Sequence, residues 1–241
     1  MKTLITLLST VFLFFSISAQ NDICQIDLPS TRVAAYANGE QVQLTFEYTI
    51  NEPGGARIFA RPFTNGDLTP GYGASCSPVY TGNGTGSAFF TINSGTSLVD
   101  EIRFLITTAD QTNTLREFYI PVTYHFGENG VNNFSFTQPQ EIGSLLLGEQ
   151  VNITFDYNVS HPGGTRIFVR PFTDGELTPG YGASGSPVFS GTGTHTVNFS
   201  INSGNNIRVD ALRVTIVNES QTQTLNTFFI PVNWYWSTVK I

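Results

Sequence analysis

The residues best suited to binding chemistry occur twice in the chain with the same spacing. They form two Arg-x-Phe-x-Arg segments, namely Arg57, Phe59 and Arg61, and Arg166, Phe168 and Arg170. Alternate residues of a strand share a face, so each segment would present two guanidinium groups beside an aromatic ring. Guanidinium forks suit carboxylates, sulfates and sugar hydroxyls. The structural alternative is that these arginines pair with acids across strands while their stems cover apolar neighbours.

A loop that follows each segment adds acids and tyrosines, namely Asp67 and Tyr72, and Glu176 and Tyr181. Each tyrosine stands between glycines and would either expose its ring to stack on a sugar or fold back over the loop. The oxygens around Asp67 and Glu176 also fit calcium. However, Asn-Gly and Asp-Gly are preferred tight turns. We therefore expect no cofactor and keep calcium as an open alternative.

Both clusters belong to a long internal repeat. Residues 40–84 return as residues 149–193, and the match continues to Tyr124 and Trp234 with one inserted residue near Arg208. Two copies of a unit of roughly 100 residues predict two similar domains in tandem. We place the first repeat at 20–126 and the second at 127–241, with 127–133 as the linker. The copies agree best over the loop, which marks it as the candidate site.

The first residues have the pattern of a secretory signal peptide. Lys2 supplies the positive start, residues 4–17 are apolar, and Ser16-Ile17-Ser18-Ala19 resembles a cleavage site. We expect residues 1–19 to be removed and the protein to be secreted, in the extracellular space, the periplasm or at the cell surface. The apolar run is shorter than the roughly 20 residues that cross a bilayer, so we expect no membrane insertion.

Charge and cysteine content narrow the possible partners. The net charge is −7 and charged residues are 12% of the chain, which argues against nucleic acid. The chain has two cysteines, Cys24 and Cys76, and in a secreted protein they are expected to form a disulfide. That bond would tie the N-terminal segment to the loop of the first repeat. Free or intermolecular thiols are the alternative.

Apolar residues alternate with polar ones through most of each repeat. The clearest run is residues 42–50, with Val42, Leu44 and Phe46 on one face, and residues 151–159 repeat it. This period of two predicts half-buried strands. The final strand of each repeat contains a proline, Pro121 or Pro231, which marks an edge or a bulge. Trp234 is expected in the core, and Trp236 is expected to be partly exposed near the end of the second domain.

Several short strands per repeat, separated by Gly, Pro and Asn, predict an all-β protein of two antiparallel sandwiches. The openings Gly39–Tyr48 and Gly148–Tyr157 resemble the second strand of immunoglobulin-like and fibronectin-III-like modules of secreted proteins. The resemblance lies in the pattern of strands, because the Cys…Trp…Cys core of true immunoglobulin domains is absent. It implies two tandem immunoglobulin-like domains. A small jelly roll is the alternative.

We find no sequence signal for catalysis, such as zinc-ligand spacing, a nucleophile elbow or a phosphate loop. We expect a non-enzymatic binding protein, with carbohydrate as the favoured ligand and the repeated loops as twin sites. The partner would be a glycan or another component of the cell surface or matrix. The alternative is a structural or adhesive protein that self-associates through the loops.

Overall fold

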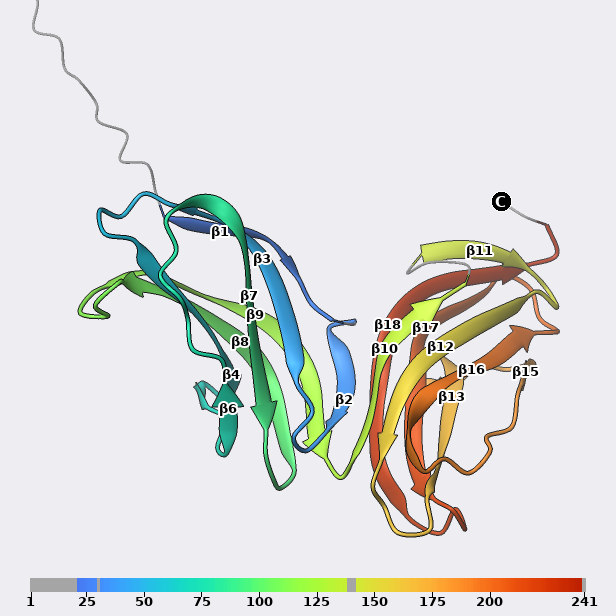
Figure 1. Ribbon diagram of the computed structural model, residues 1–241. Helices are drawn as coiled ribbons and strands as arrows, with labels where there is room; N and C mark the ends of the chain where they lie inside the picture. The colour runs from blue at the N-terminus through green and yellow to red at the C-terminus, as the bar shows by residue number, and fades with distance from the viewer. Residues whose placement is uncertain (1–20, 30, 138–141, 240–241) are drawn as a thin grey trace, which may run out of the picture.

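The computed structural model describes residues 21–29, 31–137 and 142–239, and every regular element in them is a β-strand (Figure 1). The expected signal peptide, residues 1–19, lies outside the described residues. Within the described part of the chain, no helix is long and apolar enough to cross a membrane. The strands form two sandwiches, as the repeat predicts, and each buries its own apolar cluster.

The first sandwich pairs a four-stranded sheet with five strands of a larger sheet. The four-stranded sheet has the order β1-β3-β7-β6, and the facing strands have the order β2-β9-β8-β4-β5. The strands are β1 (Asp22–Asp27), β2 (Val33–Ala37), β3 (Val42–Ile50), β4 (Ala56–Thr64), β5 (Asp67–Leu68), β6 (Tyr72–Ala74), β7 (Gly82–Ile92), β8 (Ser97–Thr108) and β9 (Thr114–Gly127).

The second sandwich repeats this plan. Its sheets have the orders β10-β12-β16-β15 and β11-β18-β17-β13-β14. The strands are β10 (Asn129–Phe136), β11 (Ile142–Leu146), β12 (Gln150–Val159), β13 (Thr165–Thr173), β14 (Glu176–Leu177), β15 (Tyr181–Ala183), β16 (Gly191–Ile201), β17 (Ile207–Asn218) and β18 (Thr224–Ser237).

The strand order in both domains is that of an immunoglobulin-like sandwich. Strands β1, β3, β7 and β6 stand as A, B, E and D of that fold, and β4, β8 and β9 stand as C, F and G. The sequence predicts that β3 is strand B, the second strand of the fold. It lies between β1 (strand A) and β7 (strand E), as that arrangement requires. The jelly-roll alternative is therefore not the observed fold.

The two sandwiches share one nine-stranded sheet. Strand β10 of the second domain pairs with β2 of the first, with Val131 opposite Ala35. Ala35 belongs to the core of the second domain, whereas its neighbours Ala34 and Tyr36 belong to the first. Because successive residues of a strand point to opposite faces, the two cores lie on opposite sides of the sheet at this junction.

A polar network and a close backbone approach secure this joint. The Glu40 carboxylate accepts hydrogen bonds from the Ala37 backbone N–H at 2.8 Å and from the Asn132 side chain at 2.6 Å. Burial raises the pKa of Glu40, although these two hydrogen bonds oppose the rise. At Gly130 an added Cβ would lie 2.6 Å from Glu40 Oε2 and 2.7 Å from the Ala37 nitrogen. Glycine is therefore the residue that lets the two domains approach this closely.

The alternating pattern correctly locates most of the core, with one error at the end of the chain. Trp234 is fully buried, as expected, but Trp236 is fully buried too. Trp236 packs against Phe199 at 5.7 Å between ring centroids, and its indole N–H donates to the Glu149 carbonyl. Strand β11 pairs with this part of β18, which extends the core further than the sequence indicates.

The prolines of the last strands coincide with bulges. The register between β8 and β9 shifts between Val99 and Glu101, and Glu101 lies opposite Pro121. The pairing of β9 with β2 begins only at Thr123, so the missing N–H of Pro121 leaves no gap in that ladder. Pro231 lies at the matching shift between β17 and β18.

Candidate functional site

The repeated loop covers the open edge of β4. The backbone N–H of Ile58 donates to Ser77 Oγ at 2.8 Å, and Ala56 and Tyr80 exchange both backbone hydrogen bonds. Thr69 N–H adds a bond to the Pro62 carbonyl at 3.0 Å. Unpaired strand edges invite aggregation, and covering them with a loop removes that hazard. The close agreement between the two copies therefore has a structural cause.

The second loop covers β13 in the same way. Ile167 N–H donates to Ser186 Oγ at 2.8 Å, and Thr165 exchanges both backbone hydrogen bonds with Phe189.

Arg57 and Arg166 hold these loops in place. Arg57 Nε donates to the Ala109 carbonyl at 2.8 Å, and its Nη1 donates to the Ser77 carbonyl. Arg166 makes the equivalent bonds to Glu219 and Ser186. Their partners are backbone carbonyls, whereas the structural alternative placed acids opposite them. Much of the donor capacity of these two guanidinium groups is already used within the protein.

The acidic residues of the loops sit at tight turns. Asn65 and Gly66 both have positive φ, of 53° and 85°, as a two-residue hairpin turn requires. Asp67 follows on the exposed two-residue strand β5. The second repeat matches it, with Glu176 exposed on β14. Within the described residues, no group of three or more His, Cys, Asp or Glu side chains is placed to hold a metal ion.

Arg61 and Tyr72 do come together, and so do Arg170 and Tyr181. Each arginine is half-buried, and burial lowers its pKa while a hydrogen bond with the tyrosine raises it. Arg61 also lies over the Phe59 ring, 5.0 Å from its centroid, and Arg170 lies 5.1 Å from that of Phe168. The tyrosines are half-buried against the cores, so they are not free platforms at the tip of a loop.

The outer side of the sheet extends this cluster beyond the loop. Arg61 lies directly opposite Arg103 on β8, which in turn lies opposite Tyr119 on β9. Arg103 lies 4.7 Å above the Phe63 ring, and Tyr119 packs edge-on against the same ring at 5.5 Å. We call this set the first arginine–aromatic face; it consists of Phe59, Arg61, Phe63, Arg103 and Tyr119.

The second domain carries an equivalent set. Arg170 lies opposite Arg213, and Arg213 lies opposite Phe229. Arg213 lies 4.5 Å above the Phe172 ring, which contacts Phe229 edge-on at 5.4 Å. The second arginine–aromatic face consists of Phe168, Arg170, Phe172, Arg213 and Phe229. The sequence alone does not single out Arg103 and Arg213, which stand at outward positions between buried apolar residues of their strands.

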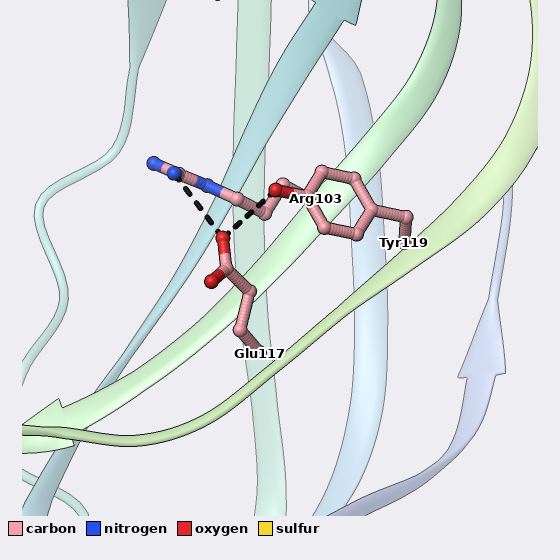
Figure 2. A network of polar contacts seen from close by, with 3 residues as sticks. All are labelled: Arg103, Glu117 and Tyr119. Carbon is pink, nitrogen blue, oxygen red and sulfur yellow. Dashed lines mark hydrogen bonds and ion pairs between the residues drawn. The ribbon is translucent and has the colours of Figure 1, made fainter. Parts of the chain in front are cut away.

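The first face includes a carboxylate, Glu117, that the second face lacks. Figure 2 shows Arg103, Glu117 and Tyr119 of the first face. Glu117 Oε1 accepts from Arg103 Nη1 at 3.4 Å and from the Tyr119 hydroxyl at 2.9 Å. An internal carboxylate thus partly neutralises the first face. Strand register places Thr227 at the corresponding position of the second face, because Thr215 pairs with Thr227 as Leu105 pairs with Glu117.

The expected disulfide between Cys24 and Cys76 is not formed. Both thiols are free and exposed. Cys24 lies in β1, and Cys76 lies two residues beyond β6, at the opposite edge of the four-stranded sheet. Three strand spacings of about 4.8 Å separate these edges, whereas a disulfide requires Cα atoms within about 7 Å. The sequence shows that both residues belong to one domain but not that they lie on opposite edges.

No protein-family model matches the chain. No curated protein matches it either. Solved structures with a similar arrangement include a protein of unknown function from Porphyromonas gingivalis W83, with a TM-score of 0.31 and 9% identity over 89% of this chain and 99% of that one. The Salmonella enterica SafA pilin in complex with the SafB chaperone gives 0.32 and 9%, over 86% and 96%. The E. coli chaperone DraB gives 0.30 and 9%, over 86% and 97%.

The strand order therefore defines the class of this protein. The chain is a tandem pair of immunoglobulin-like β-sandwiches joined through one continuous sheet.

Proposed function

We propose that this protein is a secreted, non-enzymatic binding protein that holds carbohydrate on its arginine–aromatic faces. The observation that carries the proposal is the recurrence of the same five-residue arrangement in both domains. In each domain two arginines lie opposite one another on neighbouring strands, and three aromatic rings pack around them. The bonds that attach each loop to its strand edge do not require this arrangement.

The chemistry of the faces suits sugars. Guanidinium groups donate several hydrogen bonds in a fixed fork and match hydroxyl and carboxylate oxygens. An aromatic ring offers an apolar surface to the apolar side of a sugar ring. Tyr119 is 42% exposed and Phe229 is 46% exposed, so each face has an accessible ring beside its arginines. Arg61, Tyr72, Arg170 and Tyr181 keep their proposed roles, with the tyrosines now supporting the arginines from the loop side.

The two faces belong to different sheets. The first lies on the shared nine-stranded sheet and the second on the five-stranded sheet β11-β18-β17-β13-β14. Each domain therefore presents a site of its own, and a polymer that reaches both would gain avidity without new contacts.

A glycan array and a pull-down with insoluble polysaccharides test this proposal on the mature chain. We expect glycan binding that falls in the combined variant Arg61→Gln and Arg170→Gln. The matched control is Arg116→Gln, which removes a charge from an arginine that pairs with Asp22 instead. Equal loss in the control would show that net charge, and not these faces, controls binding.

A protein that binds no neutral or acidic glycan would contradict the proposal. Self-association measured by light scattering would then favour the alternative of a structural or adhesive protein, for which the edge-covering role of the loops is the supporting observation.

A further inference from the structure

The second arginine–aromatic face carries positive charge without the acids that accompany the first. Two carboxylates stand among the outward residues of the first face, Glu117 on β9 and Glu101 on β8 opposite Phe63. Thr227 stands where the first face has Glu117, and Ala211 stands opposite Phe172 where the first has Glu101. Both acids are thus replaced by neutral residues.

The two arginines of this face lie directly opposite each other on neighbouring strands. Arg170 and Arg213 are cross-strand partners, and such partners have Cβ atoms about 4.5–5.5 Å apart. Among the described residues, the ion pairs within 4.0 Å involve Arg103, Arg116 and His161, and neither Arg170 nor Arg213 takes part in one. Like charges placed in this way destabilise a sheet. An anion bound between them would relieve that repulsion.

The ring beside the pair is also accessible. In the first face the Tyr119 hydroxyl donates a hydrogen bond to Glu117 Oε1 at 2.9 Å. In the second face the corresponding ring is Phe229, which has no hydroxyl to form such a hydrogen bond and is 46% exposed. The face therefore joins two cations to an apolar ring surface, in a protein whose net charge is −7.

We propose that the second face binds the acidic sugar units of an anionic glycan. The carboxylate or sulfate group would lie between Arg170 and Arg213, and the sugar ring would lie against Phe229. Glu117 already forms an ion pair with Arg103 and would therefore prevent the same ligand from binding to the first face. This inference rests on the proposed function, since it names the class of glycan and the domain that binds it.

The test is a calorimetric titration of the mature chain with polygalacturonate. Its fully methyl-esterified form is the matched neutral probe, and dextran sulfate is the sulfate probe. We expect the esterified polymer to bind at least about 10-fold more weakly, because charge-assisted hydrogen bonds are the stronger ones. The ratio of polygalacturonate to dextran sulfate affinity identifies the preferred anionic group.

Two variants exchange the acid between the faces. Thr227→Glu places a carboxylate beside Arg213 and should reduce polygalacturonate affinity about 10-fold. Glu117→Thr removes the internal carboxylate of the first face and should add a second binding site, seen as a doubled stoichiometry. Both positions are exposed or partly exposed strand residues, and thermal unfolding checks that each variant folds. Arg213→Gln should lose binding, whereas Arg116→Gln, at an arginine that pairs with Asp22 outside both faces, should leave it unchanged.

Three results would overturn the inference: unchanged binding in Thr227→Glu, equal binding of the methyl-esterified polymer, or equal binding of poly-glutamate, which would indicate an acidic peptide. Binding of neutral glycans that Thr227→Glu does not alter would overturn this inference and leave the proposed function standing. No binding of any glycan would overturn both.

Discussion

Replacing Ser77 by alanine should destabilise the first domain by about 1–3 kcal/mol. Ser77 Oγ accepts the buried N–H of Ile58 at 2.8 Å, and this bond attaches the loop to the edge of β4. Alanine offers no acceptor, and a buried donor left without a partner costs about 1–3 kcal/mol. Ser186→Ala removes the equivalent bond to Ile167 in the second domain. The two variants should therefore lose similar amounts of stability.

Urea unfolding followed by circular dichroism measures this effect as a change in midpoint at constant slope. Ser87→Ala is the matched control, because Ser87 is exposed on β7 of the same domain, and surface substitutions change stability by at most about 0.5 kcal/mol. If Ser77→Ala and Ser186→Ala behave like this control, the loop does not protect the strand edge through these serines, and the structural explanation of the repeat is wrong.

Three further predictions concern the joint and the cysteines. Burial raises the pKa of Glu40 above its ordinary 4.5, so the folded protein holds this proton more tightly than the unfolded chain, and stability should fall as pH rises from about 4.5 through the raised pKa. Glu40→Gln should flatten that dependence in urea unfolding. Gly130→Ala should loosen the joint, because its Cβ would meet backbone at 2.7 Å, and small-angle scattering should record a larger radius of gyration. Cys24 and Cys76 should both react with a thiol reagent in the native protein, and a reductant should leave the melting temperature unchanged.

Each of these has a clear contrary result. A fall in stability above pH 4.5 that is as steep in Glu40→Gln as in the wild type, or no fall in the wild type, would contradict this role of Glu40. Identical scattering of Gly130→Ala and wild type would show that the joint tolerates the methyl group. A single intramolecular disulfide found by peptide mass mapping would restore the bond expected from the sequence.

The fold was largely readable from the sequence because a two-residue period and a repeat are local signals. Val42, Leu44 and Phe46 point inward as expected, and all three are fully or almost fully buried. The shared sheet was not readable, since it depends on the pairing of Val131 with Ala35 across almost 100 residues. The burial of Trp236 has a similar cause, because it follows from the parallel pairing of β11 with the end of β18.

The candidate site was only partly readable. Arg61 and Tyr72 could be chosen because they recur in both copies, and they lie together. Arg57 recurs for a different reason, which is its bonds to backbone carbonyls. Recurrence thus selects residues that fix the loop as readily as residues that face a ligand. Arg103 was overlooked because its importance depends on its position opposite Arg61 in the folded sheet.

The central claim is that ligand binds on the outer sheet faces and not at the loop tips. Nuclear magnetic resonance titration of the isotope-labelled mature chain with oligogalacturonate tests it most directly. We predict shifted amides on β13, β17 and β18 around Arg170, Arg213 and Phe229, with little change in β12 and β16 of the opposite sheet. Shifts confined to the turn at Asp174 and Gly175 or to the opposite sheet, or no shifts at all, would contradict the account.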